Sequence, residues 1–359
     1  MHHASLGLGA LLQAPNRPDW LRCGASNWSS HAVANGVAAL SHGLSQRLQV
    51  LPGDRIIVLG ASSDHFIMAL LACMDAGAIA VPLNTRWSGR EVADAVQRCA
   101  PRVIMADGQH LHLLQDVTDA SGPCPHLVLL GHGVGGSQQP GAHSAFYTTT
   151  MQLMAETSSQ QSAMAGPPAQ LQLLSPADGA ALICFTSGTT GRPKGVVLSH
   201  SNFHCQSLAK LACVGYCRQD VYLHLAPLFH IGGLSSLMAV IMAGGSHIVM
   251  PKFDPAAALH TISTAGVTTF IAVPTMVLDM AAAAHRHSHS VWPSVLRILV
   301  GAGGTSAKMQ VQRLYSANKA YALVPLPLIV LKSVVGWSTV CRKCSPACFP
   351  TQPCTVRTA

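Results

Sequence analysis

The strongest constraint on the fold is a repeated alternation of short, apolar, β-branched runs with helix-like segments. Arg55–Ala61 is the first such run, and Asp64–Ala76 after it has a helical pattern with Asp64 as its expected N-cap. Further along, Ser88 and Glu91 have the spacing of a capping box, which predicts a helix that ends near Cys99. Strands that alternate with helices pair in parallel, and the helices then cover the faces of the sheet.

The alternation continues through most of the chain, with one interruption. Residues from about 131 to 177 are rich in Gly, Ser, Gln, Thr and Pro, so we expect a flexible surface insertion there. The other predicted strands are 78–83, 102–106, 127–130, 181–186, 195–198, 221–225, 247–250, 267–273 and 296–300. The other predicted helices are 201–213, 233–243, 254–265, 274–284 and 305–316.

Composition indicates a globular protein with a large core, because 49% of the 359 residues are hydrophobic and only 10% are charged. The longest candidate for a membrane span, Ala320–Trp337, is interrupted by two prolines and a lysine, so we expect no transmembrane segment. The formal net charge of +8 does not predict nucleic-acid binding, because the basic excess lies beyond Asp279, the last acidic residue.

The 12 cysteines fall into two groups. Those before residue 300 lie mostly within apolar segments and indicate buried free thiols in a reducing compartment. Cys341, Cys344, Cys348 and Cys354 lie close together, but their intervals are too short and irregular for a paired zinc site, so we predict no metal site. We expect residues 319–359 to form a disordered tail with a composition of its own.

The strongest functional signal is the segment Thr186–Gly195, which reads TSGTTGRPKG and lies between two strand-like runs. Its three glycines allow the backbone to turn and to present N–H groups to an anion. Its hydroxyl side chains add further donors, and Lys194 supplies a compact positive charge suited to phosphate. We therefore predict phosphate binding here, and the alternative is an ordinary hairpin turn rich in Ser and Thr.

A Walker A loop would also bind phosphate, but its residue order is different. That motif places Lys next to Ser or Thr and leads into a helix. Here Lys194 lies between Pro193 and Gly195, and the residues that follow favour a strand. The proline also disfavours helical geometry at Arg192. The pattern therefore excludes a P-loop NTPase.

Thr186–Lys194 resembles the phosphate-binding signature of the adenylate-forming superfamily, which includes acyl-CoA synthetases, peptide-synthetase adenylation domains and luciferase. The resemblance extends from about Gly53 to about Lys308. It implies an α/β fold, the large N-terminal domain of that superfamily with parallel sheets flanked by helices, which we expect to span residues 1–318. Ala226–Leu234 (APLFHIGGL) most resembles the plant and algal members that attach CoA to 2-succinylbenzoate.

The resemblance also implies roles for individual residues. His230 corresponds to a position at the acyl pocket, although one of 19 histidines could equally be an ordinary surface or core residue. Together with Lys194 it is the expected catalytic pair. The residues implied to hold the ATP phosphates are Thr186, Ser187, Gly188, Thr189, Thr190, Gly191 and Lys194. Those implied to lie against the adenine are Gly301, Ala302 and Gly303, for which an ordinary strand-to-helix turn is the alternative.

The family pattern is incomplete in this sequence. The resemblance implies a Tyr-Gly-x-Thr-Glu motif whose Glu helps to hold magnesium, but the corresponding segment Leu314–Leu323 reads LYSANKAYAL. The later ribose-binding Asp, the hinge and a C-terminal domain with a catalytic Lys are also absent, so we expect a C-terminally truncated family member. Loss of that Lys would remove transition-state stabilisation of roughly 3 kcal/mol.

Two functions follow from these observations. The first is ATP-dependent activation of a carboxylic acid to an acyl-adenylate and then to its CoA thioester. By resemblance the acid is 2-succinylbenzoate of the phylloquinone and menaquinone pathway. It implies ATP, Mg²⁺ and CoA as reactants, no nucleic-acid partner, and a plastid or peroxisome, although Arg357–Ala359 is not a peroxisomal ending. The second is a non-catalytic nucleotide-binding fragment or interaction protein.

Overall fold

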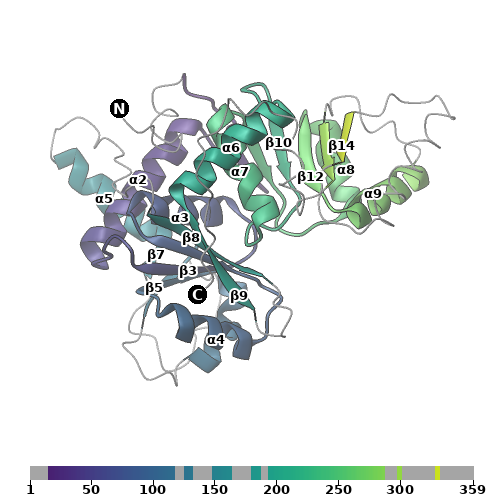
Figure 1. Ribbon diagram of the computed structural model, residues 1–359. Coiled ribbons are helices and arrows are strands. Elements are labelled where there is room, and N and C mark those ends of the chain that lie inside the picture. Colours follow the sequence, from purple (N-terminus) through teal and green to yellow (C-terminus); the bar gives the residue numbers. More distant parts are fainter. Residues whose placement is uncertain are drawn as a thin grey trace, which may run out of the picture.

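The computed structural model describes residues 15–117, 125–131, 148–163, 179–186, 193–287, 297–300 and 328–331. These residues form two seven-stranded sheets, which lie in separate parts of the molecule and are joined by helices packed between them (Figure 1). The predicted class, α/β with parallel sheets flanked by helices, is confirmed.

The first sheet is built from strands between residues 55 and 199 and contains the two ends of the predicted phosphate-binding segment, Thr186 and Lys194. Its neighbouring strands are parallel except for the last pair, β8 and β9, which form an antiparallel hairpin. In spatial order the strands are β7 (Thr148–Thr149), β6 (His126–Leu129), β5 (Val103–Ala106), β3 (Arg55–Leu59), β4 (Ile79–Leu83), β8 (Ala180–Thr186) and β9 (Lys194–Ser199).

The second sheet combines N-terminal strands with strands from the second half of the chain. All its neighbouring strands are parallel except β1 and β2. In spatial order they are β14 (Leu328–Leu331), β13 (Arg297–Val300), β12 (Thr269–Ala272), β10 (Val221–His224), β11 (Ser246–Val249), β1 (Leu21–Cys23) and β2 (Ser26–Trp28).

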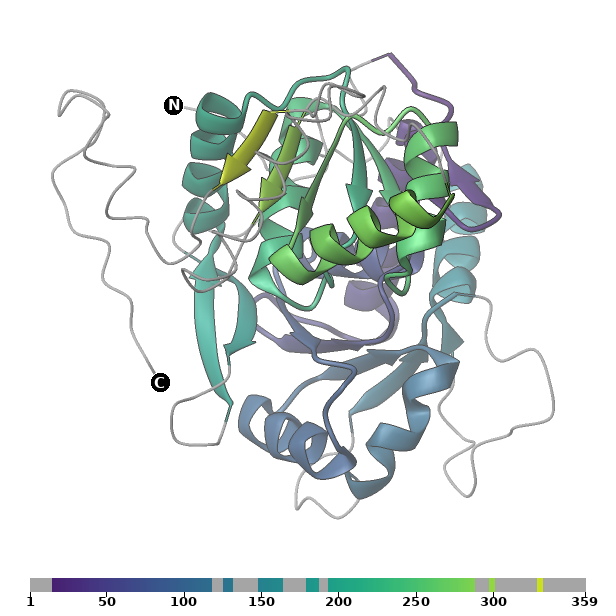
Figure 2. The ribbon, with the colours of Figure 1, turned by 90° about the vertical axis from the view of Figure 1, so that its right-hand side faces the viewer.

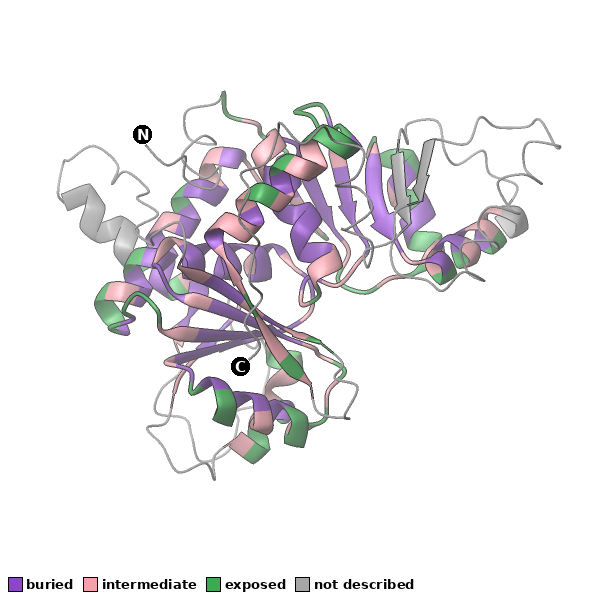
Figure 3. Cartoon of the chain, in the orientation of Figure 1, coloured by how far each residue is buried: buried purple, intermediate pink, exposed green. Residues whose placement is uncertain are grey.

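Helices cover both faces of each sheet, as the alternating sequence pattern predicts. Buried side chains show which helix covers which face, and the outward faces of helices such as α4 are exposed (Figure 3). On the first sheet the helices are α2 (Ser30–Arg47), α3 (Asp64–Asp75) and α5 (Thr150–Ala163) on one face and α4 (Gly89–Cys99) with the 3₁₀ segment η1 (Gly108–Val117) on the other. On the second they are α6 (His200–Val214) and α7 (Ile231–Ala243) on one face and α8 (Pro255–Thr264) with α9 (Pro274–His287) on the other.

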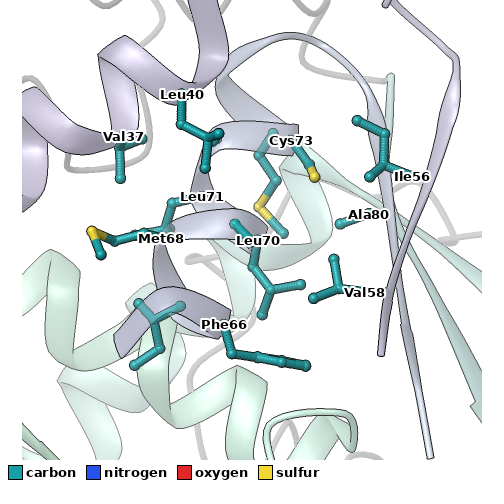
Figure 4. Close-up of a cluster of buried hydrophobic side chains, with 14 of the residues drawn as sticks. Val37, Leu40, Ile56, Val58, Phe66, Met68, Leu70, Leu71, Cys73 and Ala80 are labelled. Atoms are coloured by element: carbon teal, nitrogen blue, oxygen red, sulfur yellow. The ribbon is translucent and has the colours of Figure 1, made fainter. Parts of the chain in front are cut away.

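One hydrophobic core joins the two sheets. Helix α3 contributes many of its side chains, and Phe66 and Leu70 of α3, Val58 of β3 and Leu40 of α2 all belong to this cluster (Figure 4). The same cluster includes Leu237 and other buried residues of α7, which also packs on the second sheet. Leu228, in the loop that joins β10 to α7, belongs to the same cluster, so apolar packing holds this loop against the first sheet.

The helix starts confirm one prediction and correct another. Ser88 and Glu91 form the predicted capping box at α4, since the Ser88 N–H donates to the Glu91 carboxylate at 2.8 Å. Helix α3, however, begins after Ser63, whose hydroxyl accepts from the Phe66 N–H at 3.1 Å, so Asp64 is not its N-cap. The Asp64 carboxylate instead accepts from the indole N–H of Trp28 at 2.7 Å. A tertiary contact between β2 and α3 thus decides the role of this side chain.

The predicted flexible insertion at about 131–177 is wrong for residues 148–163. They form β7 and α5, and Leu153 and Met154 of α5 are buried against α2. A Cβ atom at Gly36 of α2 would lie 2.7 Å from the Met154 methyl carbon, and one at Gly43 would lie 3.2 Å from the Leu153 Cβ. Two glycines on α2 therefore allow α5 to approach closely, a relation that the composition of 131–177 does not reveal.

Two further segments differ from the sequence-based expectations. Strand β14 lies within the expected tail 319–359 and pairs in parallel with β13, so four residues of that tail belong to the second sheet. Strands β1 and β2 and helix α2 were not predicted. The predicted helix 305–316 lies outside the described residues. Within the part of the chain that the structure describes, no helix is long and apolar enough to cross a membrane.

Candidate functional site

The stem of the predicted phosphate-binding segment is the β8–β9 hairpin, at the edge of the first sheet and directly before α6 (Figure 2). Thr186, the last residue of β8, is in register with Lys194, the first residue of β9. Both are exposed, and the Thr186 hydroxyl donates to the Lys194 carbonyl at 3.4 Å. The structure thus brings together the first and last residues of the predicted phosphate loop. The loop residues Ser187, Gly188, Thr189, Thr190 and Gly191 lie outside the described residues.

His230 lies where the loop after β10 enters α7, as the sequence predicts. It is the N-cap of the helix, with extended backbone angles of φ −112° and ψ 145°. Its ring Nδ1 accepts a hydrogen bond from the Gly232 N–H at 3.1 Å. A nitrogen that accepts from an N–H carries no proton, so the neutral ring holds its proton on Nε2. Partial burial lowers the pKa of His230, which favours this neutral form at pH 7.

The turn that carries His230 requires a glycine at position 233. A Cβ atom there would lie 2.5 Å from the Pro227 carbonyl oxygen and 2.9 Å from that of Ala226. These are backbone atoms, which cannot move away as a flexible side chain could. Gly233 therefore allows α7 to begin in direct contact with the loop before it.

Two contacts hold this loop against the first sheet, close to the β8–β9 hairpin. The buried Leu228 N–H donates to the Ser62 hydroxyl, just after β3, at 3.1 Å. The Phe229 carbonyl oxygen lies 3.9 Å from the thiol of Cys184, which is two residues before Thr186 on β8. Burial raises the pKa of the Cys184 thiol, so it stays protonated and acts as a weak donor. The loop that carries His230 thus lies against β8, close to the end of that strand.

Two other histidines show what an ordinary core histidine looks like in this protein. His224 and His247 are fully buried on neighbouring strands, with His224 Nε2 3.0 Å from His247 Nδ1. Burial lowers the pKa of His224 to about 3 and also lowers that of His247, so both rings are neutral. His230 differs because it is only partly buried, keeps solvent-accessible surface and caps a helix with its ring beside the hairpin. It is not a core histidine.

The remaining predicted site residues are not placed. Gly301, Ala302 and Gly303 lie outside the described residues. Sequence reasoning missed Ser62 and Cys184, because no local motif marks a residue that acts by holding a distant loop. Among the described side chains, no group of three or more His, Cys, Asp or Glu residues could hold a metal ion.

The fold and the sequence of this site define the class of protein. The AMP-binding enzyme family matches residues 12–323, so the chain belongs to that family. The large N-terminal domain of an adenylate-forming enzyme, which the sequence predicts, is confirmed.

Several proteins named as CoA ligases are similar in sequence. The chloroplastic/peroxisomal 2-succinylbenzoate–CoA ligase of Arabidopsis thaliana is 36% identical over 276 residues, which cover 77% of this chain and 47% of that protein. The 2-succinylbenzoate–CoA ligase of Bacillus cytotoxicus is 31% identical over 267 residues, 73% of this chain and 46% of that protein. The feruloyl-CoA synthase of an Amycolatopsis species is 29% identical over 272 residues, 76% of this chain and 48% of that protein. The chain spans about half the length of these relatives.

Solved structures share the fold. A putative long-chain-fatty-acid CoA ligase from Rhodopseudomonas palustris superimposes with a TM-score of 0.69 at 22% identity, covering 87% of this chain and 73% of that one. The anthranilate CoA ligase AuaEII in complex with anthranoyl-AMP gives 0.69 at 20% identity, covering 83% and 54%. ATP-bound MatB from R. palustris gives 0.64 at 22% identity, covering 84% and 55%.

Proposed function

We propose that this chain binds ATP at the β8–β9 hairpin and a carboxylic acid beside His230, and that it joins them as an acyl-adenylate. The observation that carries the proposal is the arrangement of the two segments. Thr186 and Lys194 are paired at the loop end of the hairpin. The loop that carries His230 contacts Cys184, two residues earlier on β8. A polyanion and a carboxylate would then lie side by side, as the reaction requires.

In the proposed first step, a carboxylate oxygen attacks the α-phosphorus of ATP. A bond forms from that oxygen to phosphorus, the bond to the bridging oxygen breaks, and pyrophosphate leaves with the electron pair. The Lys194 ammonium and the loop hydroxyls and N–H groups offset the negative charge and orient the triphosphate. His230, neutral with its proton on Nε2, would donate a hydrogen bond to the carboxylate and position it.

In the proposed second step, the thiolate sulfur of CoA attacks the acyl carbon and AMP leaves. The favoured acid is 2-succinylbenzoate, because Ala226–Leu234 resembles the ligases for that acid and two of the similar proteins carry that name. Mg²⁺ would be held mainly by the ATP phosphates, since magnesium commonly binds through phosphates and few carboxylates.

Replacement of Lys194 tests the nucleotide half of the proposal. In Lys194→Ala we expect affinity for MgATP to fall about tenfold or more, because a phosphate-binding positive charge is lost. Equilibrium dialysis with radiolabelled ATP measures the affinity, and pyrophosphate release with 2-succinylbenzoate measures the first step. Lys252→Ala removes another exposed lysine, outside the hairpin, and is the matched control. Equal ATP binding by both variants would contradict the proposal.

His230 can be tested separately from its role in folding. Asn also caps helices well, so His230→Asn should keep the stability of the wild type, whereas His230→Ala should lose about 1 kcal/mol. We expect both variants to lose affinity for the acid, measured by its effect on pyrophosphate release or by direct binding in the presence of MgATP. Full acid affinity in His230→Asn would show that the ring only caps the helix.

A second candidate function is nucleotide binding without catalysis. The segment Leu314–Leu323 takes the place of the family's Tyr-Gly-x-Thr-Glu motif, which favours this alternative. Binding of MgATP that depends on Lys194, without pyrophosphate release for any acid offered, would support it over the ligase.

A further inference from the structure

We infer that Arg98 of α4 is a positioning residue for the phosphate-binding hairpin. This inference rests on the proposed function and extends it to a residue outside the recognised motif. Its basis is that one side chain contacts the chain just before and just after the hydroxyl-rich segment. Phe185 precedes Thr186, and Pro193 precedes Lys194. Both are contacted by the Arg98 guanidinium.

The contacts are of two kinds. Arg98 Nη2 donates to the Pro193 carbonyl oxygen at 2.9 Å. The guanidinium carbon lies 5.5 Å from the centre of the Phe185 ring, a distance typical of a cation–π interaction. The side chain therefore connects the end of β8 to the start of β9 from outside the sheet.

Two neighbouring side chains fix Arg98 and Phe185 in this arrangement. Asp94, one turn earlier on α4, forms an ion pair with Arg98 at 2.8 Å. The ring of Trp87 meets the Phe185 ring edge to face, with 5.4 Å between centroids and 78° between planes. Helix α4 itself is anchored by its capping box and by buried Val92 and Ala95. The Arg98 side chain thus links the hairpin to a well-anchored helix.

Arginine suits this position for a physical reason. Its planar guanidinium can donate to a carbonyl, pair with a carboxylate and stack on an aromatic ring at the same time, whereas the ammonium of lysine cannot stack in that way. Donors that bind a phosphate work best when they are held in place before the ligand arrives. By fixing Phe185 and Pro193, Arg98 would fix the ends of the segment that supplies those donors.

A positioning role and a merely structural role of Arg98 predict different effects on stability and on phosphate binding. Arg98 and Asp94 are both substantially exposed, at 41% and 36% of their side-chain surface, and exposed ion pairs contribute little to stability. Loss of Arg98 should therefore leave the melting temperature close to that of the wild type. Binding of phosphate should weaken, because the loop would have to be ordered at the time of binding.

The test compares Arg98→Ala and Arg98→Lys with Arg90→Ala, which removes another exposed arginine of the same helix. Calorimetry on the full chain measures affinity for MgATP, inorganic triphosphate and adenosine. For Arg98→Ala we expect about tenfold weaker binding of MgATP and triphosphate, unchanged adenosine binding, and faster amide hydrogen exchange at 185–195. Arg98→Lys should recover only part of the loss, and Arg90→Ala should match the wild type.

The outcomes separate this inference from the proposed function. If Lys194→Ala weakens MgATP binding but Arg98→Ala behaves like Arg90→Ala, the role of Arg98 is overturned and ATP binding stands. If Arg98→Ala loses adenosine as well and melts at a much lower temperature, Arg98 is only structural and the inference fails. If the wild type binds MgATP no better than adenosine, both proposals fall.

Discussion

At the scale of single residues, two adjacent glycines have different roles. Gly232 supplies the N–H that donates to His230, and a Cβ atom there would meet only the imidazole Nδ1 at an ordinary 3.4 Å. At Gly233 the added atom would collide with two backbone carbonyl oxygens. Of these two glycines, Gly233 is therefore required by the backbone, whereas Gly232 can be replaced.

We predict that Gly233→Ala lowers the free energy of unfolding by about 2 kcal/mol, because overpacking against backbone forces a shift of the loop. Gly232→Ala should change it by less than about 1 kcal/mol, because alanine favours the helix and meets no close backbone atom. Urea denaturation of both variants measures the difference. Equal stability of the two would show that the loop adjusts freely around position 233.

At the scale of elements, α3 ends in a side chain whose negative charge is unfavourable at that position. Asp75 is the last residue of the helix, where the helix dipole disfavours a negative charge. Burial raises the pKa of its carboxyl from 3.8 to about 6, while a hydrogen bond from Ser41 of α2 partly opposes this rise. The folded state therefore favours the protonated carboxyl, and ionisation of Asp75 destabilises it.

We predict that Asp75→Asn stabilises the protein at pH 7 by about 1–3 kcal/mol, because the amide keeps the shape of the carboxyl without its charge. Since the folded pKa is raised, the wild type loses stability as pH rises from 3.8 to about 6. The stability difference between variant and wild type should be small below this window, grow through it and then stay constant. Urea denaturation across this pH range measures it, and a difference independent of pH would contradict the assignment.

At the scale of the whole molecule, the two sheets share one hydrophobic core. Buried residues of α3 from the first sheet and α7 from the second belong to a single core. The buried hydrogen bond from the Leu228 N–H to Ser62 crosses the same junction. Because the proposed site lies at this junction, its geometry depends on how the two parts pack.

We predict that Ser62→Ala costs about 1–3 kcal/mol of stability, because it leaves a buried N–H without an acceptor. Unfolding should still occur in one transition, since the shared apolar core is unchanged. Ser263→Ala, which removes an exposed hydroxyl that donates to the His260 carbonyl, should stay within about 0.5 kcal/mol of the wild type. Two separate unfolding transitions would show that the sheets are independent.

Local sequence predicted much of this fold. The periodic apolar runs gave most strands of both sheets, and the capping box gave the start of α4. The phosphate segment was predicted to lie between two strands, and its ends are indeed paired as Thr186 and Lys194. These features depend on neighbours within a few residues, so the sequence alone contains the information.

The tertiary structure decided what depends on distant partners. Helix α5 depends on the glycines of α2 for close packing, and Asp64 bonds to Trp28 instead of capping its own helix. The contacts of Ser62, Cys184 and Arg98 with loop and hairpin likewise join residues far apart in the chain. By itself the sequence determined most of the elements and the chemical groups of the site, because periodicity and turn chemistry are local. Only the packing of two sheets around one core decided how those groups are held, because such contacts exist only once the chain is folded.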